Sequence, residues 1–114
     1  MEIKTPFGNE KVITCGIDRR LPKELVFILW QTLRSHVFED LMSHRKVDYF
    51  QIFELSSGEA PGALTVKHLQ EQPHYCRISM VYLSDAQNIR ELYGVKVYVI
   101  DDGTHSTMLF PEEY

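Results

Sequence analysis

The chain is poor in the residues and spacings that mark the commonest catalytic and ligand-binding sites. Its 114 residues include two cysteines, Cys15 and Cys76, which form no C-x-x-C pair, so neither a zinc site nor thioredoxin-type chemistry is indicated. Six glycines are dispersed and form neither a Walker pattern nor G-x-G-x-x-G, which argues against a phosphate-binding loop. The nucleophile pattern G-x-S-x-G is missing as well. Motifs therefore assign no catalytic residue, no cofactor and no metal.

Long apolar runs and an excess of basic charge are also missing. No run approaches the roughly 20 apolar residues that a membrane helix needs, and the start MEIKTPFGNE lacks the layout of a signal peptide. We therefore expect a soluble, cytoplasmic protein without a membrane partner. The formal net charge is -4 and the basic residues are scattered, which disfavours nucleic acid as a partner because such binding depends on neutralising phosphates.

What the sequence does contain is one strong helix among several strands. Apolar residues at helical spacing, with a proline in the first turn, predict a helix from about Pro22 to about Met42. The stretches KVITCGI, VDYFQIFELS, ALTVKHLQ, YCRISMVYL, VKVYVI and STMLF read as strands. This order predicts an α+β fold, a mostly antiparallel sheet of about five to six strands with the long helix packed across one face. We expect a loosely ordered N-terminal arm over residues 1–10 and a single domain over residues 11–114.

Both cysteines fall in stretches that we interpret as strands with apolar neighbours. Each is therefore expected to be a buried free thiol that packs as a small hydrophobe. In YCRISMVYL the apolar residues alternate with polar ones, which predicts a half-buried strand with one face in the core. That face holds Cys76, Ile78, Met80 and Tyr82.

Two further segments surround these strands. His68 and His74 flank the stretch LQEQP, match no metal-binding spacing, and are expected to be solvated. Residues 84–94, SDAQNIRELYG, fit either a two-turn helix or a loop, because Asn88 and Ile89 are poor helix formers.

The start of the long helix, LVFILW, is apolar on all its sides. A helix that lies on a sheet normally buries a stripe of a little over 100°. Phe27 and Ile28 therefore need cover from outside that stripe, either from the chain's own arm and loops or from a second molecule. The second reading predicts a homodimer through the start of the helix, or an unknown protein partner there.

The stretch DDGTH lies between two strands, and Asp102-Gly103 is a strong signal for the turn of a hairpin. Asp101, Asp102 and His105 could also supply metal ligands. Consecutive strand residues point to opposite faces, however, so the turn is the favoured interpretation. The alternative is a small metal-dependent hydrolase or nuclease that adds Glu54 or His74 to this cluster.

Acidic residues gather at the C-terminal end, where Glu112 and Glu113 could join Asp101 and Asp102 in a negative patch. Such a patch either solvates the surface or docks on a basic partner. Together with the helix start, it gives the following candidate interaction surface: Phe27, Ile28, Asp101, Asp102, His105, Glu112, Glu113 and Tyr114.

The aromatic residues of DYFQIF offer a second alternative, a binder of single-stranded nucleic acid. Tyr49, Phe50 and Phe53 could stack on bases. Asp48 and Glu54 flank them, however, where such a site needs lysine and arginine, so packing in the core is favoured.

PKELVFILWQTL, DYFQIFELS, QEQPHY and VYVIDDGTHSTMLFPEEY resemble the family catalogued as domain of unknown function 960, over about Lys11 to Tyr114. The resemblance implies a short cytoplasmic protein of low-GC Gram-positive bacteria, their phages or their plasmids. It implies no activity and assigns no catalytic residue. Together with the residues themselves, it favours a non-enzymatic protein-binding module that docks through strand edges and its acidic C-terminal end.

Overall fold

The computed structural model describes residues 5–84 and 88–114. Its order of elements confirms the expected alternation of one long helix with strands, and adds a short helix before the long one. The elements are β1 (Glu10–Ile13), α1 (Cys15–Arg20), α2 (Lys23–Met42), β2 (Phe50–Ser57), β3 (Ala63–Gln70), β4 (Tyr75–Tyr82), β5 (Lys96–Asp101) and β6 (His105–Leu109), with 3-10 turns at Ile89–Leu92 and Pro111–Glu113.

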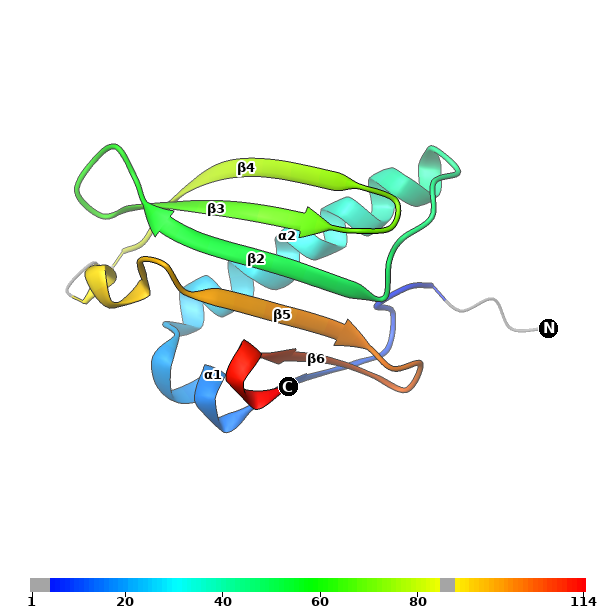
Figure 1. The fold of residues 1–114 in the computed structure, drawn as a ribbon, viewed down its shortest axis with the longest axis horizontal. Coiled ribbons are helices and arrows are strands. Elements are labelled where there is room, and N and C mark those ends of the chain that lie inside the picture. The colour runs from blue at the N-terminus through cyan, green and yellow to red at the C-terminus, as the bar shows by residue number, and fades with distance from the viewer. Residues whose placement is uncertain (1–4, 85–87) are drawn as a thin grey trace.

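The strands form one six-stranded sheet in the order β1-β6-β5-β2-β3-β4, and α2 lies across one face of it, behind the strands in Figure 1. All neighbouring pairs are antiparallel except β1 and β6, which are parallel. The predicted α+β fold is therefore confirmed. None of the helices described here is long and apolar enough to cross a membrane.

The long helix has the bounds that its apolar spacing predicted. Pro22 precedes its first residue, and Glu24 in the first turn interacts favourably with the positive end of the helix dipole. One side of α2 is fully enclosed, because Leu25 and Leu29 are 0% exposed. Phe27 lies on the opposite side and is 63% exposed, so the described part of the chain does not cover the outer side of the helix.

The core lies between α2 and the face of the sheet that α2 covers. Burying each large apolar side chain there contributes about 1.5–3 kcal/mol. The sheet supplies Phe53, Leu55, Val66, Val97, Val99 and Met108 to this layer, and the segment before β1 supplies Phe7.

The predicted hairpin at DDGTH is confirmed. β5 and β6 pair in antiparallel register, with Asp101 opposite Ser106. Gly103 has a φ of +94°, a conformation that side chains with a Cβ rarely adopt. This explains why glycine stands at the tip of the turn.

The sequence predicted that the face of β4 with Cys76 and Ile78 lies in the core, and this prediction is wrong. Cys76 and Ile78 lie on the side of the sheet away from α2, and both are exposed, as are Met80 and Tyr82. The physical reason is the position of β4 at the edge of the sheet, where the face opposite α2 has no described layer over it. The alternation correctly predicted which residues share a face, but it carried no information about which face is covered.

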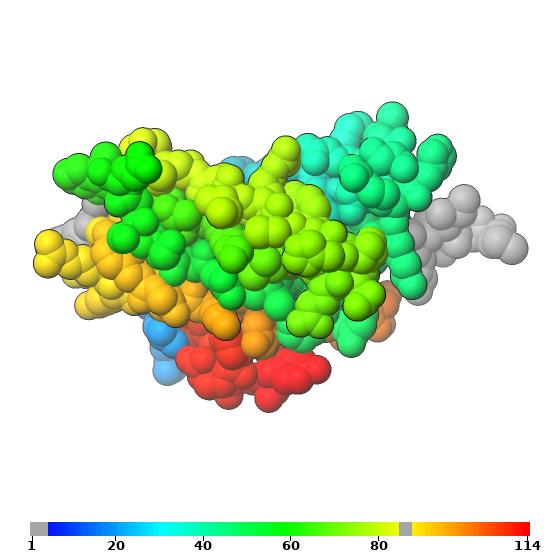
Figure 2. Space-filling view, turned by 45° about the horizontal axis from the view of Figure 1, so that its top comes forward, coloured from blue at the N-terminus to red at the C-terminus, as the bar shows by residue number. Residues whose placement is uncertain are grey.

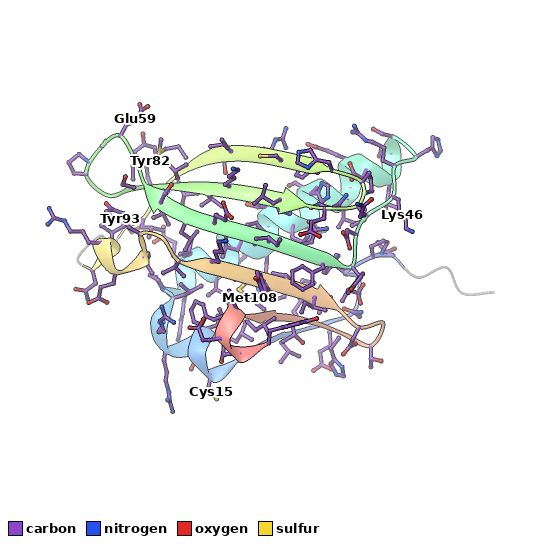
Figure 3. All side chains as sticks on the ribbon, viewed as in Figure 1. Cys15, Lys46, Glu59, Tyr82, Tyr93 and Met108 are labelled. Atoms are coloured by element: carbon purple, nitrogen blue, oxygen red, sulfur yellow. The ribbon has the colours of Figure 1, made fainter. Side chains whose placement is uncertain are left out.

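The expectation for Cys15 is also wrong. The strand KVITCGI ends at Ile13, and Cys15 begins α1, where it is exposed at the lower side of the view in Figure 3. Thr14 ends the strand because its side chain accepts a hydrogen bond from Ile17 N and so caps the helix. The capping geometry overrides the strand preference of the β-branched residues before it.

Part of the segment 84–94 forms a 3-10 turn at Ile89–Leu92, and residues 85–87 lie outside the described part of the chain. Gly94 has a φ of +81° and donates its N–H to Leu55 O at 2.8 Å. The turn therefore ends by attaching to β2, which brings the chain into position for β5.

Candidate functional site

The acidic residues of the hairpin turn bond to their own chain. Asp101 accepts hydrogen bonds from Phe7 N at 2.9 Å, from the Asn9 side chain at 2.8 Å and from Gly103 N at 2.9 Å. Burial alone would raise the pKa of Asp101, but these three bonds lower it overall. Asp101 therefore holds the segment before β1 against the hairpin through hydrogen bonds from Phe7 and Asn9.

Asp102 has a separate task at the tip of the turn. Its carboxylate accepts from His105 N at 2.7 Å and from Thr104 N at 2.8 Å, and both bonds lower its pKa. The His105 ring lies 3.4 Å from the carboxylate of Glu10. The two neighbouring carboxylates thus have different partners. Asp101 bonds the segment before β1, and Asp102 bonds the backbone of the turn itself.

The described residues contain no group of three or more His, Cys, Asp or Glu side chains placed to hold a metal ion. The geometry around the turn gives the hydrolase alternative no support, because each carboxylate is already occupied by backbone or amide donors.

The acidic C-terminal end folds back on α1. Glu113 accepts from Phe110 N at 2.9 Å and from the Thr14 hydroxyl at 2.7 Å, and these bonds lower its pKa. Glu112 pairs with Arg20 at 2.9 Å. Glu112 and Glu113 stay exposed in spite of these contacts, and Tyr114 has 76% of its surface exposed.

The aromatic residues of β2 and its approach divide between the core and the surface. Phe53 is 0% exposed and cannot stack on a base, whereas Tyr49 is exposed and Phe50 is half-buried. Phe50 packs against Tyr98 and Tyr114 on the face of the sheet away from α2, with ring centroids 4.8 and 5.8 Å apart. These contacts form a small aromatic cluster, and they do not bring lysine or arginine to it.

The expectation that His68 is solvated is wrong. His68 is 1% exposed, as are His36 of α2 and Gln70, while Gln51 is 0% exposed. His68 Nε2 lies 2.7 Å from Gln51 Oε1, and His36 Nε2 lies 2.9 Å from Gln70 Oε1. Because both glutamine oxygens are acceptors, each ring donates from Nε2 and carries its proton there.

The second nitrogen of each ring, Nδ1 of His36 and of His68, has no hydrogen-bond partner among the described residues. Burial lowers the pKa of His68 to about 3, with a further contribution from the charges of His36 and Arg77. An enclosed, hydrogen-bonded pair of this kind stabilises one arrangement of the core. It offers no opening for a substrate in the described structure, since all four side chains are buried.

The described surface does have an apolar hollow elsewhere, between the outer side of α2 and the segment before β1. We call it the helix groove; it has a volume of about 420 Å³. Thr5, Pro6, Phe7 and Gly8 form one wall. The side chains of α2 on its other wall include Phe27, Trp30, Arg34, Phe38 and Leu41.

The groove has an unusual combination of exposure and charge. Phe38 is 66% exposed and Leu41 is 45% exposed, so large apolar side chains face solvent there. Among the described residues, Lys11 and Arg34 are the charged ones that line it, and none of the acidic ones does. The Lys11 ammonium lies 5.9 Å from the centre of the Trp30 ring, close enough for a cation–π contact.

Comparison with known proteins places the chain in a family. The family described as staphylococcal protein of unknown function, DUF960, matches residues 10–113. The chain belongs to the DUF960 family. No curated protein sequence matches it.

This DUF960 member has the fold of a crystallised protein of unknown function from Enterococcus faecalis. The two chains are 19% identical with a TM-score of 0.72, and the match covers 100% of this chain and 98% of that chain. At this identity the likeness establishes the shared fold alone.

Sequence reasoning found one wall residue of the helix groove, Phe27, and missed the rest. Phe38 and Leu41 continue the apolar stripe of LVFILW along the outer side of α2, at 11 and 14 residues after Phe27. That spacing was a readable signal. No local pattern predicted the opposite wall, because Phe7 is held there by the hydrogen bond from its N–H to Asp101, 94 residues further along the chain.

Proposed function

We propose that this chain is a protein-binding module that holds a short, apolar and acidic segment of a partner protein in the helix groove. The observation that carries the proposal is the exposure of Phe27 and Phe38, 63% and 66%, beside a groove that is already formed in the single chain. Scattered exposed apolar residues are ordinary, but contiguous ones beside a hollow mark interaction surfaces.

The residue types in the groove match those that dominate binding energy at protein interfaces. Aromatic and arginine side chains are enriched among such residues, and Trp30, Phe38 and Arg34 supply them. Because these residues follow one side of a helix, the groove is elongated along α2. It therefore suits a helical or extended segment with two or three apolar anchors.

The positive charge of the groove favours partner segments that carry acidic residues. The chain carries a formal net charge of -4, yet the described residues line the groove with two cations, Lys11 and Arg34, and with no anion. Neither cation forms a salt bridge with another residue in the described ranges. A partner segment with carboxylates beside its anchors would pair with them, whereas a basic segment would leave them opposed by like charge.

Two other occupants or surfaces compete with this proposal. The homodimer through the start of α2 would place a second copy on Phe27, with half-buried Ile28 beneath it. The acidic end would instead dock through Glu112 and Glu113, whose carboxylates would first have to leave Arg20 and Thr14. This internal pairing favours the helix groove over the acidic end. The family resemblance to proteins of phages and plasmids suggests that the partner belongs to a bacterial or mobile-element system.

Trp30 gives a direct test, because it is the single tryptophan of the chain and it lines the groove. A displayed library of peptides is selected on the purified protein, and individual binders are then titrated while the Trp30 emission is recorded. We expect the selected peptides to share apolar anchors and acidic residues, and to shift the emission on binding.

Three variants decide whether that binding uses the groove. Phe38→Glu and Arg34→Glu should each weaken the selected peptides by about tenfold or more, since each removes a contact and adds a repelling charge. Tyr114→Glu is the matched control, an exposed aromatic residue on another surface, and should bind as the wild type does. Equal affinity for all four proteins would sink the proposal. Loss on reversal of Glu112 and Glu113 alone would move the site to the acidic end.

A further inference from the structure

The outer edge of β4 is open along the described structure. β4 is the last strand of the sheet, and it pairs with β3 without interruption from Tyr75 opposite Gln70 to Tyr82 opposite Ala63. In Figure 2 its yellow-green side chains lie at the surface along the upper side of the molecule. Its second edge therefore presents unpaired backbone N–H and C=O groups to solvent.

Exposed edges of this length are usually protected by a proline, a bulge or a charge. β4, with the sequence YCRISMVY, contains no proline, and its unbroken register with β3 leaves no bulge. Its one charged side chain, Arg77, is turned to the α2 side, where it bonds Glu39 at 3.3 Å. The edge thus has none of the features that keep other strands away.

We propose that this edge binds a second copy of the same chain, by antiparallel pairing of β4 with β4. The inference rests on observations separate from those behind the helix groove. A strand edge is complementary to itself when two copies are related by a two-fold axis. In an antiparallel pair, residues directly opposite each other lie on the same face of the sheet. The axis must therefore be perpendicular to the sheet, so both α2 helices lie on one face of the joined sheet.

That symmetry leaves two registers that use nearly the whole strand. With the axis at Ser79, Arg77 lies opposite Val81 of the second copy; with the axis at Ile78, Arg77 lies opposite Ser79. With the axis at Ser79 the two arginines lie four residues apart along the strand, so no like charges meet across the axis; with the axis at Ile78 they become diagonal neighbours on one face. Charge therefore permits a second copy as the occupant and favours the axis at Ser79.

The side chains away from α2 support the same pairing. Ile78 and Tyr82 are 65% and 66% exposed, and Met80 is also open. With the axis at Ser79, Ile78 of one copy lies beside Met80 of the other, and Cys76 lies beside Tyr82. Cross-strand apolar neighbours of this kind stabilise a sheet.

The pairing joins two strands and little else, so its area is small beside the roughly 1,600 Å² of a standard interface. We expect a dimer that dissociates on the order of micromolar concentrations and forms reversibly.

Sedimentation velocity over a concentration series tests the proposal with a matched pair of variants. Ile78→Lys puts a lysine beside the axis, where it meets its own copy or lies next to it, and should weaken the dimer by at least about tenfold. Phe27→Lys makes the same change at a similarly exposed residue of the helix groove and should leave the dimer unchanged. Because both residues are exposed, both variants should keep the wild-type circular dichroism.

An engineered disulfide between the two copies distinguishes the two registers. Tyr82→Cys is combined with Cys15→Ser, which leaves Cys76 as its partner. Within one chain these positions are six residues apart in an extended strand, about 20 Å, so a disulfide between them must join two chains. Rapid formation of a cross-linked dimer supports the axis at Ser79, and cross-linking in Met80→Cys instead supports the axis at Ile78.

A wild-type chain that stays monomeric at every concentration would overturn the proposal. So would a dimer that Phe27→Lys dissociates and Ile78→Lys leaves intact, which would place the second copy on the start of α2. Peptide binding by Trp30 is measured separately, and its success or failure leaves the β4 result unaffected.

Discussion

His36 and His68 are polar side chains enclosed between α2 and the sheet, each 1% exposed. Gln51 and Gln70 satisfy one nitrogen of each ring, at 2.7 and 2.9 Å. His68 also stacks on Phe53, with ring centroids 4.5 Å apart. His68 in this setting packs as a flat, neutral ring with one hydrogen bond, and no described acceptor faces its Nδ1 atom to stabilise a second proton.

His68 therefore makes the stability of the fold depend on pH. Burial lowers its pKa to about 3, whereas in the unfolded chain it stays near 6.5. Below about pH 6.5 the His68 ring is protonated in the unfolded chain but stays unprotonated in the folded chain until the pH nears 3. The free energy of unfolding should thus fall as the pH drops from 6.5 towards 3, by up to about 1.4 kcal/mol per pH unit.

Urea unfolding at a series of pH values measures this slope. We expect His68→Gln to flatten it by close to one proton, because glutamine cannot titrate. His74→Gln, at an exposed histidine, should retain the wild-type slope. An unchanged slope in His68→Gln would show that other groups cause the acid sensitivity.

At the scale of the element, α2 has two sides with different tasks. The inner side packs Leu25, Leu29 and Leu33 on the sheet, and each is at most 2% exposed. The outer side presents Phe27 and Phe38 to the helix groove. The apolar character of LVFILW on all sides thus serves the core and a surface together.

Two alanine variants in the same turn of α2 should separate these sides. Leu29→Ala leaves a cavity in the core and should lower the free energy of unfolding by about 3–5 kcal/mol. Phe27→Ala removes a larger side chain but should change it by no more than about 0.5 kcal/mol, because that side chain is mostly in solvent. Equilibrium denaturation of both proteins checks the contrast, and equal losses would mean that Phe27 is covered in solution.

At the scale of the whole molecule, both ends of the described chain are attached to the sheet. Asp101 holds the segment before β1, and Ser106 donates to Asn9 of the same segment. Glu113 holds the C-terminal end to the start of α1 through Thr14. These contacts place β1 parallel to β6 and set the wall of the helix groove that contains Phe7.

Asp101→Ala should loosen the attachment of the segment before β1 to the sheet and leave the C-terminal attachment through Glu113 in place. The substitution removes the acceptor of three hydrogen bonds, two of them to Phe7 and Asn9, and should cost about 1–3 kcal/mol of stability. Hydrogen exchange should quicken over residues 7–13 more than in α2. Glu59→Ala, in the exposed β2–β3 loop, is the control and should alter neither quantity.

Local patterns in the sequence predicted the elements that depend on neighbours in the chain. The bounds of α2 follow from apolar spacing and Pro22, and the hairpin at Gly103 follows from the demand for a positive φ. The Asp102 carboxylate satisfies the backbone of the same turn, which a turn signal already implies.

The sequence by itself thus determined the α+β class, the long helix and the sets of residues that share a strand face. Only the tertiary structure decided which of those faces are covered. Strand order placed β4 at an edge and left Ile78 in solvent, and it brought His36 and His68 together from α2 and β3. The reason is physical: periodicity is a property of one element, whereas burial depends on which other elements lie against it.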